Sequence, residues 1–395
     1  MLDEHDHRSL GKRLDLFHFQ DEAPGMAFWH PRGFALYRVL EEAARRQIAA
    51  QGYREVRTPQ LLRRAIWEQS GHWQSFPEGM FVFPAEEAAL KPVSCPGHAQ
   101  IFRDAQPSFR DLPLRLAEFG RVHRDEPSGT LHGLFRMREF TQDDGHVFSA
   151  SPDAEGEIIG FCAGLLDFYR AFGFEQVEVG LSLRPAARAG SDAIWDQAEA
   201  LLRRAAVGAG LDFREQPGAG AFYGPKLEFS LRDRLGRSWQ CGTIQLDFVL
   251  PERFDLEYVE RGGARVRPVL LHRALYGSLE RFAGVLLEHH AGLLPAWLAP
   301  EQVVVAPVAA EHAGYARRVA VELAAHGLRA RVDQRDDSLS RRVALAHEAG
   351  VPVFAVVGAR EERDAALSLR KKSGSVVLPL ASAIESLREE CRPPV

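Results

Sequence analysis

The sequence predicts an α+β core with a mainly antiparallel sheet, followed by a smaller α/β domain. Upstream of residue 295, strand and helix patterns are mixed without the strand–helix–strand regularity of parallel sheets. Downstream of residue 300, strand and helix patterns alternate, as they do in a small α/β domain. Between the two parts, Pro295 and Pro300 interrupt both patterns. We therefore predict two domains, at residues 1–294 and 295–395.

In the first part, apolar residues recur at spacings of three and four over residues 34–51, which predicts a helix that ends at Gly52. Alternation over residues 53–59 predicts a strand that Pro59 stops. The other elements expected in this part are strands at residues 114–120, 138–148 and 266–272, and a helix at residues 274–290.

In the second part, three apolar runs alternate with two amphipathic stretches, which predicts a mostly parallel sheet. The expected strands cover residues 303–308, 329–332 and 351–357, and the expected helices cover residues 313–326 and 338–349.

Composition excludes some classes of protein. The chain has no stretch of about 18 apolar residues and no apolar run behind basic residues, so we expect neither a membrane span nor a signal peptide. Its four cysteines form no CxxC pair, which favours a reducing, cytoplasmic location. Because the formal net charge is -5, any contact with RNA must come from local basic patches.

Cations gather on a predicted strand–loop–strand hairpin between residues 114 and 148. Arg121, Arg124, Arg136 and Arg138 belong to it, and Phe140 follows on the second strand. Several cations that face one surface suit a polyphosphate, and an aromatic ring can stack on a purine. The alternative is a solvated charged loop. Further along, Arg281 lies in a predicted helix N-terminus, where a phosphate can bind.

Three potential metal ligands occupy ends of predicted elements: Cys95, His146 and His272. Cysteine and histidine are zinc ligands, and three protein ligands leave a fourth position open for a substrate. Their sequence separations are too large for spacing to establish a site. The alternative is that each is an ordinary packed residue.

Together these segments resemble threonyl-tRNA synthetases, a family of class II aminoacyl-tRNA synthetases. The stretch RDLPLRLAEFGRVHRDEPSGTLHGLFRMREFTQDDGHVF resembles motif 2 of this family, and VLLHRALYGSLERFAGVLLEHHAG resembles its motif 3. Further matching segments, in the same order as in the family, are GKRLDLFHFQDEAPGMAFWHPRG, KPVSCPGHAQIF, GAFYGPKLEFSLRDRLGRSWQCGTIQLDF and LPAWLAPEQVVV. The resemblance runs from His7 to about Leu387 and implies a class II core followed by an anticodon-binding-type domain.

The resemblance implies one zinc ion per chain, held by Cys95, His146 and His272. In the family, zinc takes the amino group and the hydroxyl group of threonine, which explains the rejection of valine, because a methyl group cannot ligate a metal. Catalytic roles follow for Arg124 on the α-phosphate, Arg281 on the γ-phosphate, and His72 in transfer to the tRNA ribose. For His72, a structural loop histidine is the alternative.

Other positions match binding contacts of the family. Those that match contacts to ATP, which binds with Mg²⁺, are Arg124, Glu126, Arg136, Phe140, Gln245 and Arg281. Those that match the threonine pocket are Asp144, Gln142, Tyr223, Lys226, Gln240 and Thr243.

The chain departs from the family at several positions. It begins where the catalytic core of the family begins, so editing domains are expected to be missing. Val93 and Ser94 stand where Met and Asn are usual, and Glu139 replaces a glycine, which would place a carboxylate near ATP. In the tail, Asp336 replaces a usual Asn, and Ala344 and Gly350 replace usual arginines, so strict reading of the anticodon is in doubt.

The leading hypothesis is a cytoplasmic threonine–tRNA ligase that acts on threonine, ATP and tRNA(Thr), as a homodimer, with a separate protein that edits seryl-tRNA in trans. One alternative is a threonine-activating paralogue that loads a carrier other than tRNA. Another is a non-catalytic RNA-binding or regulatory protein on a synthetase scaffold. Intact Arg124, Arg281 and zinc ligands argue against the last, and the altered tail keeps the first alternative open.

Overall fold

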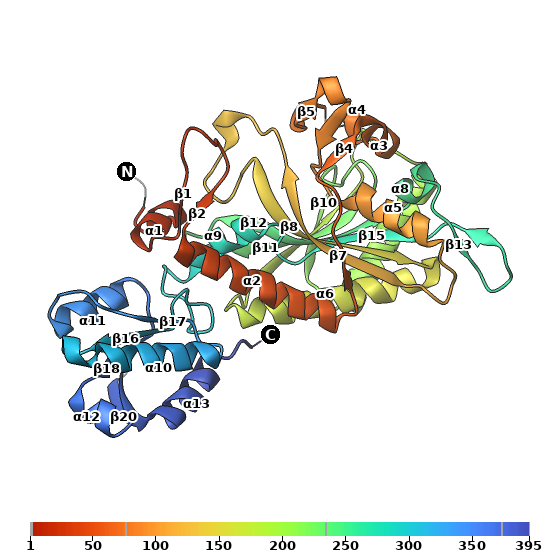
Figure 1. Ribbon diagram of the computed structural model, residues 1–395. Coiled ribbons are helices and arrows are strands. Elements are labelled where there is room, and N and C mark those ends of the chain that lie inside the picture. The colour runs from red at the N-terminus through yellow and green to blue at the C-terminus, as the bar shows by residue number, and fades with distance from the viewer. Residues whose placement is uncertain (1–2, 76, 234, 373, 395) are drawn as a thin grey trace. The chain divides into compact units, whose positions relative to one another are not determined.

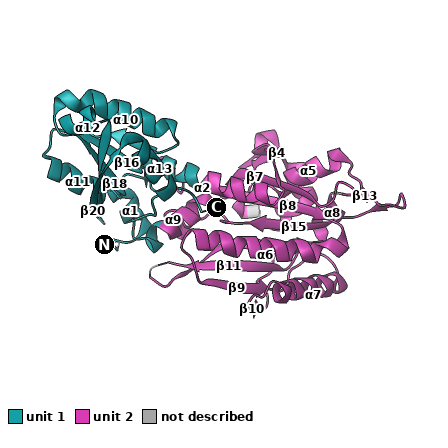
Figure 2. Ribbon diagram, turned by 90° about the horizontal axis from the view of Figure 1, so that it is seen from below, with its two compact units in different colours: residues 1–18, 28–40, 287–394 teal, residues 19–27, 41–286, 395 magenta. Residues whose placement is uncertain are grey.

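The computed structural model describes residues 3–75, 77–233, 235–372 and 374–394. The chain divides into two compact units (Figure 2). The larger unit comprises residues 19–27 and 41–286, and the smaller one comprises residues 1–18, 28–40 and 287–394. Within the described ranges, no helix is both long and apolar enough to cross a membrane.

An eight-stranded sheet forms the centre of the larger unit (Figure 1). Only its two outermost pairs, β10 with β9 and β3 with β7, are parallel, and all its other pairs are antiparallel. The predicted α+β core with a mainly antiparallel sheet is thereby confirmed. In spatial order the strands are β10 (Phe213–Gln216), β9 (Val177–Ser182), β11 (Lys226–Arg232), β12 (Ser238–Asp247), β15 (Val269–Ala274), β8 (Glu139–Ser149), β7 (Leu114–His123) and β3 (Arg54–Glu55).

Side-chain alternation separates the two faces of this sheet. On β11, Leu227, Phe229 and Leu231 are buried, and Phe229 meets Phe161 of helix α6 (Ala154–Ala171) with ring centroids 6.4 Å apart. Helix α7 (Asp192–Gly208) lies beside α6 (Figure 2). The opposite face carries polar residues, and helix α5 (Cys95–Ala105) packs there through Phe102, which stacks on Phe148 of β8. The candidate site lies on this second face.

Short elements complete the larger unit. A three-stranded sheet has the order β4 (Leu61–Arg63), β6 (Ala88–Leu90) and β5 (Val82–Phe83), and a two-stranded one pairs β13 (Tyr258–Val259) with β14 (Arg265–Val266). Short helices are α3 (Arg64–Ser70), α4 (His72–Ser75) and α8 (Val249–Arg253), with 3₁₀ turns η1 (Pro77–Gly79), η2 (Pro84–Glu86), η3 (Ser128–Thr130) and η4 (Ser151–Asp153).

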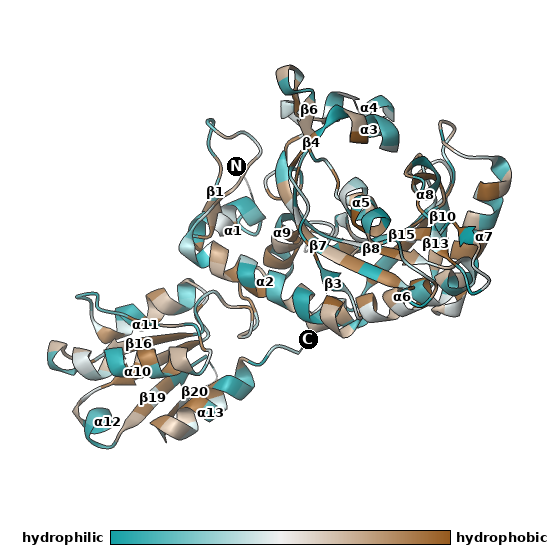
Figure 3. Ribbon diagram, turned by 45° about the vertical axis from the view of Figure 1, so that its right-hand side comes forward, coloured by the Kyte–Doolittle hydropathy of each residue, from teal (hydrophilic) through white to brown (hydrophobic). Residues whose placement is uncertain are grey.

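The smaller unit contains a five-stranded sheet with helices on both of its faces. Its strands are β17 (Ala330–Val332), β16 (Val303–Pro307), β18 (Val353–Val357), β19 (Ala366–Lys371) and β20 (Gly374–Pro379), in spatial order. The helices after Pro300 are α10 (Ala313–Ala325), α11 (Leu339–Glu348), α12 (Ala359–Arg363) and α13 (Leu380–Glu390), with the turn η5 (Ala310–His312). Alternate residues of the central strands pack on α10 and α13 or on α11, so β16 and β18 are apolar throughout (brown in Figure 3).

The prediction of a mostly parallel sheet in this unit was only partly right. Strands β17, β16 and β18 are parallel, as their alternation with helices indicates, but β19 and β20 are antiparallel. Strands β19 and β20 pair with each other, and polar and charged residues mask their strand pattern, so sequence periodicity missed both strands.

The compact units also divide the chain differently from the expected boundary at residues 294 and 295. The smaller unit takes up helix α1 (His7–Arg13), the strand pair β1 (Phe17–His18) and β2 (Phe28–Trp29), and the start of helix α2 (Pro31–Ala50). Hydrogen bonds over long sequence distances explain this. His7 Nδ1 lies 2.8 Å from Glu288 Oε1, and Arg32 Nη1 donates to Glu301 Oε2 at 2.6 Å.

Two local predictions in the core need correction. The strand expected at residues 266–272 is split into β14 and β15, because Pro268 lacks the N–H group that a continuous ladder needs. The helix expected from residue 274 is α9 (Leu279–His289), which begins five residues later. Gly277 delays it with a φ of +76°, at a place where a Cβ atom would lie 2.5 Å from the carbonyl oxygen of Cys241.

Candidate active site

A pocket of about 320 Å³ opens on the polar face of the large sheet, between β8, β12, the start of α9 and the loop that joins β7 to β8. Eight residues predicted to bind ATP or threonine line it: Glu126, Arg136, Phe140, Gln142, Gln240, Thr243, Gln245 and Arg281. Sequence reasoning missed the other lining residues, which are Leu134, Phe135, Met137, Cys241, Ala274, Gly277 and Ser278. Most of these are apolar or small, so they carried no chemical signal.

Two arginines at this pocket are partly buried and lack a carboxylate partner. Arg281 donates through Nη1 to the carbonyl oxygen of Gln240 at 3.0 Å and through Nε to that of Phe135 at 3.1 Å. Arg124 donates through Nε to the carbonyl oxygen of Pro92 at 3.2 Å, and its guanidinium lies 5.1 Å from the centre of the Phe140 ring. Burial lowers the pKa of both guanidinium groups. Among the described residues neither forms an ion pair, an arrangement that suits an anionic ligand.

Two further candidates pair with each other. Glu126 Oε2 accepts hydrogen bonds from Arg136 Nη2 at 2.7 Å and from Nε of the same side chain at 3.0 Å. The backbone oxygen of Glu126 accepts a hydrogen bond from Arg138 Nε at 2.8 Å. The loop between β7 and β8 is thus tied at its base, and its two predicted ATP contacts form one ion pair.

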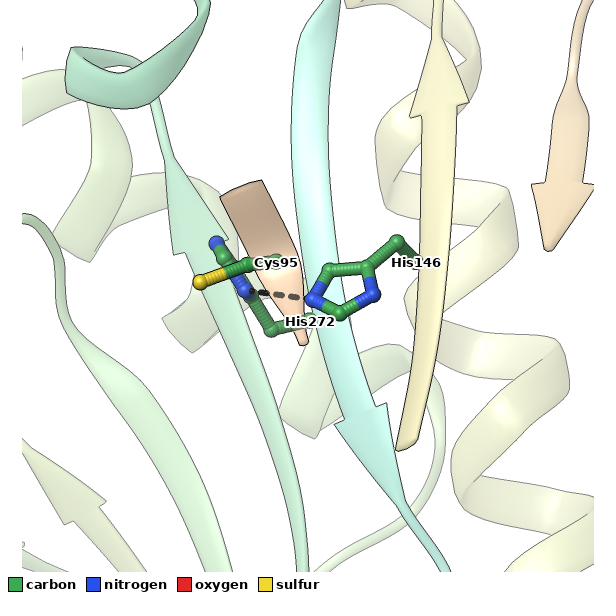
Figure 4. A group of neighbouring side chains, drawn as sticks. All are labelled: Cys95, His146 and His272. Atoms are coloured by element: carbon green, nitrogen blue, oxygen red, sulfur yellow. Dashed lines mark hydrogen bonds between the residues drawn. The ribbon is translucent and has the colours of Figure 1, made fainter. Parts of the chain in front are cut away.

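The three potential metal ligands meet at one point of the sheet (Figure 4). Cys95 is the first residue of α5, while His146 on β8 and His272 on β15 are direct cross-strand partners. One ligand atom from each residue lies within 4.8 Å of the other two, and all three residues are buried. His146 Nε2 and His272 Nδ1 are 3.0 Å apart. The sheet register therefore assembles residues that the sequence holds far apart.

The surroundings of this cluster suit a metal cation. His272 Nε2 lies 2.9 Å from Asp247 Oδ2, so a proton on Nε2 leaves Nδ1 as a ligand atom. Burial, followed by the charges of Asp144 and Asp247, raises the pKa of the Cys95 thiol well above its usual range. Burial and nearby cations lower the pKa of His146 well below its usual range, which keeps that ring neutral. A buried set of one sulfur and two imidazole nitrogens is typical of zinc.

Several contacts connect the cluster to the pocket. Gln245, which lines the pocket, is the cross-strand partner of His272. The Tyr223 hydroxyl donates to Gln245 Oε1 at 2.6 Å, and its ring centre lies 5.1 Å from that of His272. Asp144 Oδ1 lies 3.8 Å from His146 Nε2, and burial raises the pKa of its carboxyl. The cluster therefore adjoins the pocket through Gln245, although none of its three residues lines the pocket.

Lys226 and His72 are predicted site residues that lie outside the lining of the pocket. Lys226 Nζ is paired with Glu228 Oε1 at 2.7 Å, although Lys226 is the cross-strand neighbour of Gln245. His72 is buried in α4, with Nδ1 2.8 Å from Ser70 Oγ. Burial, assisted by the charges of His272, Arg124 and Arg253, lowers the pKa of His72 to about 3, so its ring is neutral at pH 7. Neither residue lines the pocket. Thr243 does, and its hydroxyl donates to the carbonyl oxygen of Leu227 at 3.2 Å.

A second group of potential ligands, Asp6, His7 and Glu288, lies in the smaller unit. Arg8 donates to both carboxylate oxygens of Asp6, at 2.9 and 2.8 Å, and Glu288 Oε1 accepts from the backbone N–H of His7 at 3.0 Å. Because protein donors already engage these carboxylates, the group fits a structural hydrogen-bond cluster.

Comparisons with known proteins agree with this geometry. Residues 83–290 match the tRNA synthetase class II core domain (G, H, P, S and T), and residues 302–390 match the anticodon binding domain. A crystal structure of the RNA binding domain of threonyl-tRNA synthetase from Cryptosporidium parvum Iowa II aligns with a TM-score of 0.94 and 38% identity, covering 98% of both chains. The chain belongs to the threonyl-tRNA synthetase family.

Other relatives support the same family. A threonine–tRNA ligase of Cupriavidus pinatubonensis is 52% identical over 99% of this chain. The chain spans 62% of the length of that relative. The crystal structure of a putative threonyl-tRNA synthetase, ThrRS-1, from Aeropyrum pernix aligns with a TM-score of 0.83 and 31% identity, covering 98% of this chain and 96% of the other. The predicted boundary at residues 294 and 295 falls between the two matched family domains.

The structure shows the surroundings of the positions at which the chain departs from the family pattern. Glu139 Oε2 lies 3.0 Å from His123 Nε2, and Glu139 Oε1 lies 3.8 Å from Arg121 Nε. Glu139 does not line the pocket, because neighbouring strand residues point to opposite faces and Phe140 faces the pocket. The expected carboxylate near ATP is thus directed elsewhere. Val93 packs against the core of α5, and the backbone N–H of Ser94 donates to Asp144 Oδ2 at 3.3 Å.

In the anticodon-binding domain, Asp336 and Ala344 are exposed, whereas Gly350 has a local structural role. Gly350 follows the last residues of α11 with a φ of +76°, the left-handed conformation that commonly ends a helix. Nearby, Arg342 is 5% exposed and donates to the carbonyl oxygens of Pro307 and Asp333. Arg342 therefore cannot substitute for an arginine that contacts RNA.

Proposed function

We propose that the chain catalyses the ligation of threonine to tRNA in two steps: ATP-dependent formation of threonyl-adenylate, then transfer to tRNA. One observation carries the proposal. Arg124 and Arg281, two partly buried cations without an ion-pair partner among the described residues, lie at or beside a pocket that adjoins a buried Cys–His–His cluster. Two arginines that can bind an anionic nucleotide, and a metal site that can bind a small hydroxy amino acid, together fit this reaction.

In the first step, Arg124 is assigned to the α-phosphate and the carboxylate of threonine, and Arg281 to the γ-phosphate of ATP bound with Mg²⁺. As a carboxylate oxygen of threonine bonds to the α-phosphorus, the bond from that phosphorus to the β-phosphate breaks and pyrophosphate leaves. Negative charge develops on the α-phosphate, and a fixed guanidinium stabilises that charge without reorganisation. Phe140 offers its ring to adenine, and the pair of Glu126 and Arg136 closes the same side of the pocket.

We assign zinc to Cys95, His146 and His272, because these residues supply two imidazole nitrogens and a buried sulfur that converge. When bound, zinc would act as a Lewis acid that binds the amino group and the hydroxyl group of threonine. Asp144 and Tyr223 lie beside the ligands and are assigned to hold the amino acid, together with Gln142, Gln240, Thr243 and Lys226. Neutral His72 is assigned to the transfer step.

Substitutions in the anticodon-binding domain support a second candidate function. The exposed Asp336 and Ala344 leave fewer cations for an RNA on α11, which favours a threonine-activating paralogue that loads a different carrier. Threonine-dependent ATP–pyrophosphate exchange tests activation, and charging of bulk tRNA then separates the two functions. Robust exchange with no charged tRNA would overturn the tRNA ligase proposal, and no exchange at all would favour a non-catalytic protein.

We expect the enzyme to activate serine at a detectable rate. Serine keeps the amino and hydroxyl groups that the cluster would read and lacks one methyl group, whose loss is worth about 1–3 kcal/mol, or about 10–200-fold. The measurement is kcat/KM for exchange with serine, threonine and valine. Discrimination against serine beyond about 1,000-fold would contradict this account, since one methyl contact cannot supply it. Valine serves as the control that lacks the hydroxyl.

We also expect the anticodon to be read loosely. Ala344 and Gly350 have no hydrogen-bonding side chain, and Asp336 adds a negative charge near phosphates. Each lost contact is worth about 1–3 kcal/mol, so the anticodon-dependent share of specificity should fall by orders of magnitude. The measurement is kcat/KM for threonine tRNA transcripts with single anticodon substitutions. If such substitutions lower kcat/KM several hundred-fold, the domain reads the anticodon strictly. The variant Ala344→Arg provides a matched gain-of-contact control.

We further propose a cytoplasmic homodimer. All four cysteines are free thiols, as in a reducing compartment. The helix at residues 34–51 and the strand that ends at Pro59 resemble the dimer interface of the family. Leu61, Val82 and Phe83, which are 49%, 38% and 42% exposed, lie on the small sheet that follows, and such apolar side chains suit an interface. Serine activation would make a separate editing protein a useful partner.

A further inference from the structure

A buried chain of side chains leads from Lys91 to the candidate metal ligand His146. Lys91 Nζ lies 2.7 Å from Glu118 Oε1, and Glu118 Oε2 lies 3.2 Å from His98 Nε2. The other ring nitrogen of His98, Nδ1, lies 2.8 Å from Nδ1 of His146. All four residues are at most 4% exposed, so water competes little for these contacts. Neither the sequence motifs nor the assigned substrate contacts gave His98, Glu118 or Lys91 a role.

Glu118 is built to remain an ionised acceptor. It receives hydrogen bonds from the backbone N–H of Thr58 at 3.0 Å and from the Thr58 hydroxyl at 2.8 Å, in addition to the contact with Lys91. Burial alone would raise the pKa of its carboxyl, but the hydrogen bonds from His98, Lys91 and Thr58 outweigh burial and lower it to about 2. An ionised carboxylate can only accept, so His98 Nε2 must be the donor in their contact.

The direction of the hydrogen bond between His146 Nδ1 and His98 Nδ1 follows from metal binding by His146. If Nε2 of His146 binds a metal, that atom carries no proton, and the proton of the neutral ring is on Nδ1. The nearest partner of this Nδ1–H is His98 Nδ1, which can accept because the proton of neutral His98 is on Nε2. Each bond in the chain then has one donor and one acceptor, and the last acceptor is Glu118.

The second histidine has the corresponding arrangement. His272 Nε2 contacts the fully buried Asp247 at 2.9 Å, which leaves Nδ1 facing His146 Nε2 at 3.0 Å. Both histidines thus direct a ligand atom to one point. Asp247 supports His272 directly, whereas Glu118 supports His146 through His98. Such outer partners fix the orientation and tautomer of a ligand.

Local structure explains why His98 can reach this position. Cys95 and His98 are three residues apart in the first turn of α5, so they project from the same face of the helix. One helical turn therefore supplies both the sulfur ligand and the support for a ligand on the neighbouring strand.

We propose that His98 is a positioning residue which, held by Glu118 and Lys91, fixes the tautomer of His146 so that its Nε2 faces the metal. This inference rests on the proposed zinc site and deepens it. It predicts that zinc affinity depends on a hydrogen-bond acceptor at the position of His98 Nδ1, beyond the three ligands themselves.

The decisive comparison is between two variants of the same residue. His98→Phe fills the space of the ring but cannot accept a hydrogen bond, whereas His98→Asn retains an amide oxygen close to the position of Nδ1. Loss of such an outer partner typically costs 10–100-fold in metal affinity, so we expect a loss of about that size for His98→Phe and a much smaller loss for His98→Asn. The matched control is His123→Phe, which removes a buried histidine bonded to a different carboxylate, Glu139, and should leave zinc affinity unchanged.

Zinc affinity is measured by competition with a chromogenic chelator, and the absorption bands of the Co²⁺-loaded protein report the ligand geometry. Wild-type affinity in folded His98→Phe, or equal losses in both His98 variants, would overturn the inference and leave the zinc proposal intact. A wild-type protein that is fully active in exchange without zinc would overturn both. If the His98 variants do not fold, nitrogen-15 NMR of histidine-labelled, zinc-loaded wild-type protein decides: protons on Nδ1 of His146 and Nε2 of His98 are expected, and a doubly protonated His98 would overturn the inference.

Discussion

Replacing either Arg124 or Arg281 by alanine is expected to lower threonine-dependent ATP–pyrophosphate exchange by at least about 100-fold, as the loss of one fixed donor to a developing oxyanion typically does. Both guanidinium groups are held by backbone carbonyl oxygens and lie at the pocket with no ion-pair partner among the described residues. Neither would need to abandon a carboxylate to bind a phosphate. The rate constant for adenylate formation, from exchange or single-turnover kinetics, gives the measurement.

Arg121→Ala is the matched control for these variants. Arg121 lies on β7, the strand that ends at His123, just before Arg124. Its side chain is 57% exposed, lies 3.8 Å from Glu139 and does not line the pocket. Its removal should leave exchange close to wild type. Arg124→Lys adds a finer test, because it keeps the charge but loses the planar fork, and it should fall between alanine and wild type. Near-wild-type exchange in Arg124→Ala or Arg281→Ala would reject the assigned role.

Removal of zinc is expected to reduce threonine activation to background. The wild-type protein should contain one zinc ion per chain, and Cys95→Ala should contain none, because it removes the only sulfur ligand of the cluster. The buried thiol of Cys95 has a raised pKa, so the thiolate needs a cation beside it, and chelation should be reversible on adding zinc back. Metal content and exchange are measured on the same samples.

The control is Cys162→Ala, which removes a buried cysteine from α6, a helix that packs on the face of the sheet opposite to the cluster. This variant should keep its zinc and its exchange activity, although it should unfold more easily because it leaves a small cavity in the core. Full exchange in a preparation from which chelation has removed the metal would show that the cluster is only structural or binds no functional metal.

Much of the core could be predicted because its signals are local. The helix expected at residues 34–51 is α2 at Pro31–Ala50, and the strands expected near residues 114–120 and 138–148 are β7 and β8. In each case periodic burial of apolar residues creates the pattern that the sequence displays. The strand expected at residues 53–59 is reduced to the two residues of β3, since the neighbouring strand β7 pairs with no more of it. Strand propensity alone does not set how many residues of a segment pair with the neighbouring strand.

The candidate site was predictable in its residue types and less so in its arrangement. Family motifs indicated Cys95, His146 and His272, and the structure brings them within reach of a single ion. The same motifs suggested that Glu126 and Arg136 each contact ATP, yet the two residues pair with each other. Lys226 pairs with Glu228 instead of lining the pocket. Such pairings depend on how each side chain is oriented in the folded loop or strand, which the motifs do not record.

The sequence by itself determined the two-part architecture, most of the regular elements and the residue types of the candidate site, because periodicity and reactive side chains are properties of short segments. Only the tertiary structure decided that β19 and β20 are antiparallel, that Glu139 turns away from the pocket, and that Gly350 ends a helix. It also placed His98 between Glu118 and His146. The physical reason is that these features depend on strand register and burial, which bring together residues far apart in the chain, such as His146 and His272, which are 126 positions apart.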